Sequence, residues 1–450
     1  PMNRRELIKL AGKVGVLGLV NMGLGRFAES IGMFMDLPAE AATLPQNYQV
    51  TAGTLWLDAQ TSALTTNAKG NGGTAVVTCT DNTDATYIRP TSATKSLKLD
   101  VTTGGTQTFW NIDWTINETL TPLSNFSFAV WTNITDFTGW GCGLFLSKAA
   151  TFADRYNYGP VSVAPNAART GWNTFTLHRG TTSSVTGTPA LTDTFTRVRL
   201  QFVIPANATG TWYISPVYKN SYNRPKIVFS FDDQDASQYT NGYQVLDTYG
   251  LPGSQCIQTS FTGGVTVPQF LEMKADGWSF HNHSQTHPNL TELTVAAAKE
   301  EMRLAQAWLD NNGFTYGRTT VVFPNGATND AIDVAMGELG YTHGAIVRKQ
   351  LDKLWDGFEQ PRRINRWNTD QSSSLATLTG VVDDAIKFGS AVVFYSHAIL
   401  DGATGSNTER VTYLGLVQYV ARLAAGNVLD VVTLQGLIDG LTNPRRKRST

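Results

Sequence analysis

The pattern of apolar residues changes once along the chain, near residue 223, and this change constrains the fold more than any other feature. From 46 to 222, apolar residues alternate with polar ones, as at Leu97, Leu99 and Val101, in short runs bounded by Gly, Asn, Thr or Pro. Alternation with a period of two is typical of half-buried antiparallel strands. We therefore predict that residues 46–222 form an antiparallel β-sandwich of jelly-roll-like type.

Residues 223–441 follow a different rhythm. Short β-branched and aromatic runs, such as 227–231 and 391–395, alternate with segments of helical periodicity, for example 294–312. Thr294 is a suitable N-cap for that helix, and Gly313 a suitable stop. Strands that alternate with helices favour a parallel sheet, either open or closed into a barrel. In both architectures the chemistry gathers at the carboxyl ends of the strands.

The two ends of the chain predict export and a solvated tail. Residues 1–45 resemble a twin-arginine export signal, because Arg4 and Arg5 precede a weakly apolar stretch and small residues follow at 39–42. A helix that anchors the chain to a partner is the alternative. We expect no integral membrane segment, because no run of 18 uninterrupted apolar residues occurs. Residues 442–450 form a basic tail to which we assign no function.

Composition excludes some classes of function. The 450 residues include 35 Lys and Arg against 36 Asp and Glu, so the formal charge is −1 and nucleic acid is not an expected partner. Three cysteines are too few for a disulfide scaffold, and no CxxC pair suggests structural zinc.

Tryptophans of the first domain either fill its core or stack on sugar rings, so carbohydrate binding is a candidate role. They include Trp110, Trp114, Trp131, Trp140, Trp172 and Trp212.

Two carboxylates follow the first predicted strand of the second domain. Asp232 and Asp233 come directly after the run 227–231. Adjacent carboxylates raise each other's pKa, and burial disfavours both anions. A bound cation would relieve that cost. A pair of surface or helix-capping aspartates is the alternative interpretation.

Histidines follow two further predicted strands. His281, His283 and His287 come after the run 278–280, and His397 comes after the run 391–395. His283 and His287 stand four residues apart, so a helical turn or a tight loop brings both imidazoles to one point. Two neutral imidazoles and a carboxylate suit a divalent metal that keeps open positions. With an ordinary pKa of about 6.5, a histidine such as His397 can donate a proton near neutral pH.

These dispersed motifs resemble, in order, those of the polysaccharide deacetylase family, which contains the NodB-homology domain and forms carbohydrate esterase family four. The resemblance covers residues 226–441, nearly half of the chain. It implies a distorted (β/α) barrel that holds a divalent metal and hydrolyses acetyl groups on sugars. The matching segments are 230–233, 282–290, 323–326, 361–364 and 395–397, with a closing strand at 431–434.

The resemblance implies a role for each matching residue in the reaction. Asp233, His283 and His287 would be the metal ligands, with zinc expected first among the divalent transition metals. Asp232 would be the general base for the attacking water. His397 would be the general acid that protonates the departing amine or hydroxyl.

Further roles concern the surroundings of these groups. The backbone N–H of Asn325 would stabilise the oxyanion. Arg363, or its neighbour Arg362, would hold Asp232 through a charge-assisted contact. The residues expected to contact the substrate are Phe323, Pro324 and Tyr395.

The sequence departs from the family pattern at three positions. Gln234 stands where a glycine usually follows the two aspartates, and Val322 and Asn325 stand where many members carry arginine and tyrosine. These departures concern rate and substrate more than the metal ligands.

We predict a metal-dependent hydrolase that removes acetyl groups from an acetylated polysaccharide and acts in the periplasm or outside the cell. The alternatives are a glycan-binding protein without catalysis and a phage tail capsule deacetylase; a homo-oligomer is left open.

Overall fold

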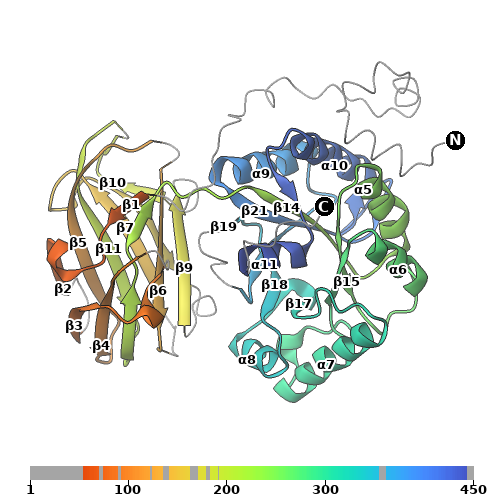
Figure 1. Cartoon of the computed structure of the whole chain (residues 1–450), viewed down its shortest axis with the longest axis horizontal. Coiled ribbons are helices and arrows are strands. Elements are labelled where there is room, and N and C mark those ends of the chain that lie inside the picture. Colours follow the sequence, from red (N-terminus) through yellow and green to blue (C-terminus); the bar gives the residue numbers. More distant parts are fainter. Residues whose placement is uncertain are drawn as a thin grey trace.

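A computed structural model describes residues 54–69, 74–89, 93–121, 124–134, 141–162, 171–178, 183–190, 192–353 and 361–442. Figure 1 shows two bodies that follow one another along the chain, one built from antiparallel strands and one built from strands and helices. The predicted export segment 1–45 and the tail beyond residue 442 lie outside the described residues. Within the described residues, no helix is long and apolar enough to cross a membrane.

The first body contains two antiparallel sheets, as the period-two pattern predicts. One sheet has the strands β1 (Thr54–Leu57), β13 (Val217–Lys219), β6 (Asn125–Thr132), β12 (Thr209–Ile214), β4 (Ser96–Thr103) and β3 (Ala75–Asn82) in this order, with β9 (Gly171–His178) beside β6. The other has the order β10 (Ser183–Thr186), β8 (Arg155–Ser162), β7 (Gly141–Ser147), β11 (Phe195–Ile204), β5 (Thr108–Glu118) and β2 (Thr66–Lys69). Short 3-10 turns lie at η2 (Thr61–Ala63) and η3 (Ala85–Tyr87).

Side chains from both sheets share one hydrophobic core. Trp110, Trp114 and Trp212 belong to it and are at most 7% exposed, so they pack inside rather than offering a face to a sugar. Trp131 and Trp172 form a cross-strand pair between β6 and β9 and are half-buried. Trp140 lies outside the described residues. Jelly-roll connectivity and carbohydrate binding stay predictions.

The second body is a closed barrel of seven parallel strands, as expected for a (β/α) barrel. Strand β21 pairs with β14, which closes the sheet onto itself. The barrel strands are β14 (Lys226–Asp232), β15 (Ser254–Ile257), β16 (Ser279–Asn282), β17 (Thr320–Val322), β18 (His343–Val347), β20 (Ile364–Asn368) and β21 (Ser390–Ser396). Short strands add to it at β24 (Asp430–Val431) and β19 (Asp352–Lys353), and β22 (Ile399–Leu400) pairs with β23 (Thr408–Glu409).

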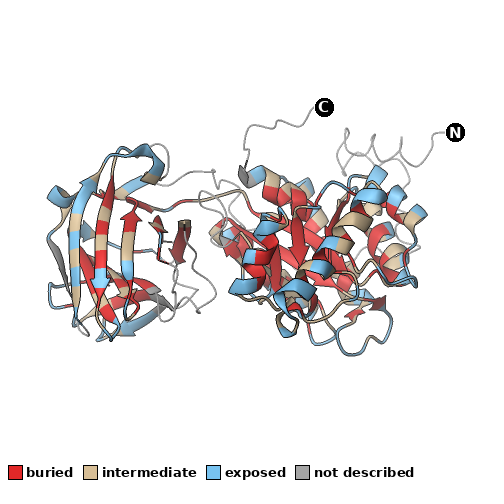
Figure 2. Ribbon diagram, turned by 90° about the horizontal axis from the view of Figure 1, so that it is seen from below, coloured by how far each residue is buried: buried red, intermediate tan, exposed pale blue. Residues whose placement is uncertain are grey.

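Helices surround the barrel, with their buried faces toward the strands and their exposed faces toward solvent (Figure 2). They are α5 (Gln244–Thr248), α6 (Val267–Ala275), α7 (Val295–Asn311), α8 (Asp330–Glu338), α9 (Leu375–Phe388) and α10 (Arg410–Ala425), with a π-helix η4 (Gln238–Tyr243) and 3-10 turns η5 (Leu290–Glu292) and η6 (Pro324–Gly326). The last helix, α11 (Leu434–Thr442), packs against the inner cluster of the barrel. The predicted start of α7 is confirmed, since the Thr294 hydroxyl accepts from the Ala297 N–H at 3.2 Å.

Alternation along each barrel strand divides its side chains between two environments. On β14, Val228 belongs to a cluster with Cys256 and Val322 inside the barrel, whereas Phe229 and Phe231 pack toward the helices. Leucines of α11 join the inner cluster and close the end where the strands begin. The end where the strands finish is left for the loops that carry the predicted chemistry.

Candidate active site

Predicted site residues from several strands lie at the carboxyl end of the barrel. Asp232 is the last residue of β14, His283 follows β16, Asn325 follows β17, and His397 follows β21. Parallel strands of a barrel finish at the same rim, so residues up to 165 positions apart in the sequence are brought to one mouth.

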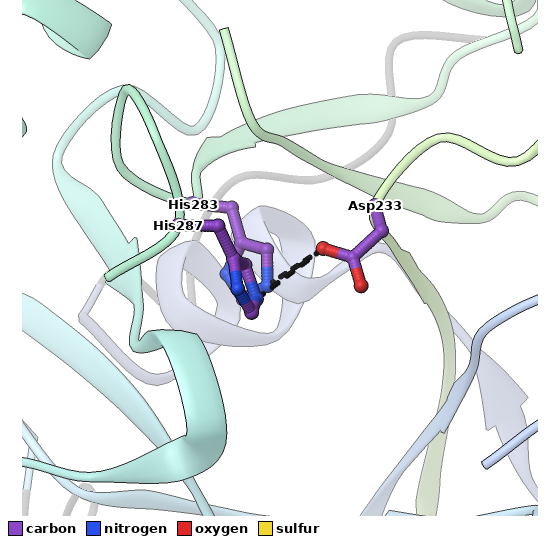
Figure 3. A group of neighbouring side chains, drawn as sticks. All are labelled: Asp233, His283 and His287. Atoms are coloured by element: carbon purple, nitrogen blue, oxygen red, sulfur yellow. Dashed lines mark ion pairs between the residues drawn. The ribbon is translucent and has the colours of Figure 1, made fainter. Parts of the chain in front are cut away.

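Asp233, His283 and His287 form a compact group of three potential ligands (Figure 3). One ligand atom from each lies within 4.8 Å of the other two. The Asp233 Oδ1 atom is 3.5 Å from His283 Nε2 and 3.4 Å from His287 Nε2. This Oδ1 atom is buried and has no hydrogen-bond partner among the described residues. The convergence predicted for these three side chains is therefore present.

The contact made by His283 Nδ1 favours a cation at this group. Its Nδ1 lies 2.6 Å from the Val322 carbonyl oxygen, which can only accept, so Nδ1 carries the proton. In the neutral ring Nε2 then presents a lone pair toward the Asp233 carboxylate. Two acceptors that face each other in a buried place are unfavourable unless a cation lies between them. Two imidazole nitrogens and one carboxylate oxygen are suitable donors for a divalent transition metal.

The two histidines differ in their electrostatic surroundings. Burial lowers the pKa of His283, but the neighbouring carboxylates of Asp232 and Asp233 outweigh it and raise this pKa above the ordinary value. Burial and the neighbouring His283 lower the pKa of His287. His281, by contrast, points away into the protein and bonds to Ser279 and to the Gly317 carbonyl. Burial lowers its pKa to about 3, so it is a neutral structural residue.

The backbone around the site is held in an unusual conformation. Nine described residues other than glycine have positive φ, and five of them are Asp233, Gln234, Ser284, His287 and Asn325. Left-handed conformations cost free energy for residues with a Cβ and gather at functional sites, where surrounding contacts hold them. Two of the three potential ligands thus depend on local strain for their direction.

Gln234 takes the place of the usual glycine with φ of +43°. Its side chain compensates by pairing with the main chain of Gln258: Nε2 donates to the carbonyl at 2.7 Å, and Oε1 accepts from the N–H at 3.0 Å. Its own carbonyl accepts from the Val265 N–H at 2.8 Å. This departure from the family pattern therefore fixes the segment that follows Asp233 to the loop between β15 and α6.

Arg366 holds Asp232, which corrects the prediction that Arg363 or Arg362 would do so. The Arg366 Nη1 atom is 2.8 Å from each carboxylate oxygen of Asp232, and both residues are almost fully buried. Burial raises the pKa of Asp232, but the Arg366 charge outweighs it and keeps this pKa well below its ordinary value. Asp232 is therefore an anion at neutral pH.

The alternation of β20 explains this correction. Ile364 belongs to the cluster inside the barrel, so Arg366, two residues later, points the same way and Arg363 points outward. Arg363 instead binds Asp333 of α8 at 2.8 Å, and Arg362 donates to the Asp333 carbonyl at 2.5 Å. The sequence signal for Arg366 is its position as the one charged residue within the strand β20.

His397 lies beside Oδ2 of Asp233, whereas His283 and His287 lie beside Oδ1. Its Nε2 atom is 3.7 Å from Asp233 Oδ2, and its Nδ1 atom is 3.2 Å from the Ser406 carbonyl oxygen. Since a carbonyl only accepts, Nδ1 donates to it, and Nε2 is the nitrogen left facing the site. Ser406 was not expected from the sequence, because nothing local to residues 401–407 marks it as a partner of His397.

The expected substrate contacts are only partly available. Phe323 is fully buried in a cluster with Val321, Ile332 and Met336, so its ring cannot contact a substrate. Its position continues the outward-facing side of β17, which is the physical reason for this correction. Pro324 is also buried, whereas Asn325 is exposed. Tyr395 is 7% exposed beneath the Arg366 guanidinium, whose carbon lies 4.4 Å from the ring centre.

Comparison with known proteins assigns the class. Residues 219–344 match the family model described as polysaccharide deacetylase. The matched segment contains Asp232, Asp233, His283 and His287, but it ends before His397. The match to residues 219–344 confirms the resemblance drawn from the motifs.

Several known proteins are similar to parts of this chain. A poly-beta-1,6-N-acetyl-D-glucosamine N-deacetylase of Staphylococcus aureus (strain MRSA252) is 24% identical over 182 residues, which is 32% of this chain and 62% of the relative. The chain therefore spans about three fifths of the length of that relative. Among solved structures, the peptidoglycan deacetylase PdaC of Bacillus subtilis is 18% identical. The match covers 50% of this chain and 94% of the PdaC chain, with a TM-score of 0.34. The chitin deacetylase of Colletotrichum lindemuthianum is 13% identical, covers 48% and 88%, and has a TM-score of 0.36.

Proposed function

We propose that this protein is a metal-dependent hydrolase that removes acetyl groups from an acetylated polysaccharide. One observation carries the proposal: the ligand atoms of Asp233, His283 and His287 gather within 4.8 Å of one another. Asp232 and His397 flank this group, at 3.9 Å from His283 Nε2 and 3.7 Å from Asp233 Oδ2 respectively. A ligand group with an acid and a base beside it is what metal-assisted hydrolysis requires.

Asp233, His283 and His287 would hold the metal ion, with zinc the first candidate. A divalent cation bound there would polarise the acetyl carbonyl and make water more acidic. Asp232 accepts the proton of the attacking water. Arg366 orients its carboxylate and keeps it ionised, which is the form that a general base needs. The backbone N–H of Asn325 stays our proposal for the oxyanion donor.

His397 supplies the second proton transfer. Its Nδ1 donates to the Ser406 carbonyl, which fixes the ring and directs Nε2 toward the reacting group. The protonated Nε2 donates to the nitrogen or oxygen of the departing sugar while the acetyl carbon–heteroatom bond breaks. Acetate and a free sugar amine or hydroxyl are the products.

The substrate is proposed from chemistry and relatives together. The Staphylococcus aureus relative is named for deacetylation of poly-β-1,6-N-acetyl-D-glucosamine, so this polymer is the first glycan to test. We also retain the proposal that the protein acts outside the cytoplasm, on the basis of the twin-arginine-like pattern in residues 1–45.

Acetate release decides the function. The full-length protein is incubated with acetylated glycans, both N- and O-acetylated, before and after treatment with a chelator, and again after zinc is restored. We expect acetate to appear, to stop with the chelator and to return with zinc. A protein that binds these glycans and zinc but releases no acetate would instead be a binding protein on a deacetylase scaffold.

A further inference from the structure

Three buried glutamines lie behind the site and take no part in the proton transfers described above. Gln234 is 2% exposed, and Gln238 and Gln255 are completely buried. Burial of an amide is costly unless its donors and acceptors are paired. What Gln238 pairs with is therefore informative about why it is there.

Gln238 lies where two strands of the barrel separate. Strands β14 and β21 are paired in parallel up to Phe231 and Ser396. The next residues are Asp232 and His397, the proposed base and acid. The Gln238 Nε2 group donates to both of their carbonyl oxygens, with a distance of 3.3 Å to that of His397. Since an amide has two N–H donors, one side chain can serve both carbonyls.

Neighbouring groups fix the orientation of this amide. Its Oε1 accepts from Gln255 Nε2 at 2.9 Å, and Gln255 Nε2 also donates to the Phe231 carbonyl at 3.1 Å. Gln238 is the first residue of the π-helix η4, a rare helix form that is frequent at functional sites. From the same segment, the Ser237 hydroxyl accepts from the Ile399 N–H at 2.8 Å.

We propose that Gln238 is a positioning residue that sets the distance and direction between Asp232 and His397, with Gln255 holding its amide. This inference rests on the proposed function, because it assigns the two connected residues their roles as base and acid. Gln238 contacts only main-chain carbonyls of these residues. It acts through them and touches neither the substrate nor the ligand atoms.

The two proton transfers explain why such a connection matters. The base and the acid act on the same reacting centre, so their relative position must be kept while the substrate binds and leaves. A misplacement of about 1 Å can cost about 100-fold in rate. Losing the clamp should therefore lower kcat and leave KM and metal affinity nearly unchanged.

The test replaces Gln238 and Gln255 separately by methionine, which is of similar length and has no amide. We expect Gln238→Met to lower kcat about 10- to 100-fold, with KM and the zinc Kd within about threefold of wild type. Gln255→Met, which leaves the Gln238 donors in place, should cause a smaller loss. If Gln238→Met does not fold, Gln255→Met decides: a folded Gln255→Met with wild-type kcat overturns the inference.

Tyr413→Phe is the matched control. The Tyr413 hydroxyl is buried and donates to the carbonyl of Gly242 at 3.2 Å. Gly242 belongs to η4, as Gln238 does, but this bond does not reach Asp232 or His397. It should lower the melting temperature and keep kcat. Equal kcat losses in Tyr413→Phe and Gln238→Met would show that Gln238 acts only through stability.

A crystal structure of zinc-loaded Gln238→Met tests the positioning directly, whether or not the wild type turns over. We expect the Asp232 or His397 carbonyl to move from its present place; unchanged carbonyls overturn the inference. A wild type that binds zinc but releases no acetate refutes the proposed function instead, so the two failures are distinguishable.

Discussion

At the scale of single residues, the site depends on charges and lone pairs that are only balanced in combination. Asp232 is buried beside Arg366, and the Asp233 carboxylate faces two imidazoles. Removing one partner of a buried charged pair leaves the other without compensation, which costs more than the pair contributes. Variants at these positions therefore separate metal binding, proton transfer and stability from one another.

Asp232→Asn tests the role of the base. The amide keeps the shape of the side chain but cannot accept a proton, so acetate release should fall by about 10²- to 10⁴-fold while zinc still binds. His283→Ala should lose zinc as well as activity, because it removes a proposed ligand. Acetate assays with calorimetric zinc titration measure both properties. A fully active Asp232→Asn would show that another group takes the proton.

Arg366→Met and Arg363→Met test which arginine supports Asp232. Each breaks a buried pair and should lower the free energy of unfolding by about 3–5 kcal/mol in urea titrations. Only Arg366→Met should reduce kcat, because Arg363 binds Asp333 on the outer side of the barrel. Loss of turnover in Arg363→Met with normal turnover in Arg366→Met would restore the assignment made from the motif.

At the scale of elements, loops rather than strands hold the ligands in place. The loop between β15 and α6 receives Gln234 through paired main-chain bonds, and its residues Thr259 and Ser260 donate to the Ser284 and Gln285 carbonyls of the histidine loop at 3.2 and 3.0 Å. This loop therefore joins the aspartate segment to the histidine segment. Its own conformation requires glycine at one point.

Gly264→Ala tests that loop. Gly264 has φ of +99°, and a Cβ there would meet the Gln234 carbonyl oxygen at 2.1 Å. Gly250 also has positive φ, of +65°, but has open space around it. Both alanine variants carry the backbone cost of about 1–2 kcal/mol, and Gly264→Ala should lose more because of the added contact. Equal losses in denaturant titrations would contradict the tight fit described at Gln234.

At the scale of the whole molecule, the two domains have separate hydrophobic cores, and the potential metal ligands belong to only one of them. A ligand that binds the folded state stabilises it in proportion to its concentration relative to Kd. The effect of a metal should therefore be confined to the barrel domain, where it would connect the segment after β14 with the segment after β16.

Calorimetry with and without zinc tests this separation. Zinc at about 100 times its Kd should stabilise the barrel by about 2.7 kcal/mol and raise one unfolding transition, while the transition of the antiparallel domain stays unchanged. In His283→Ala neither transition should respond. A shift of both transitions in wild type would mean that the two domains unfold as one unit.

The amino-acid sequence by itself determined which chemical groups stand at the strand ends. The change from a period of two to alternating strands and helices predicted the antiparallel strands and the parallel barrel, and Asp232, Asp233, His283, His287 and His397 were each predicted beside the strand where they are found. These features are local, since a strand and the residue after it are read from a few consecutive positions.

Tertiary structure decided which groups are partners. Arg366 meets Asp232 across 134 positions, and His397 meets the Ser406 carbonyl of a loop that has no motif. Which of two nearby arginines enters the barrel depends on the direction of the β20 side chains once the sheet closes. The alternation along β17 likewise buries Phe323 on the outer side. A linear pattern does not contain that closure, because it arises from pairing β21 with β14 across most of the domain.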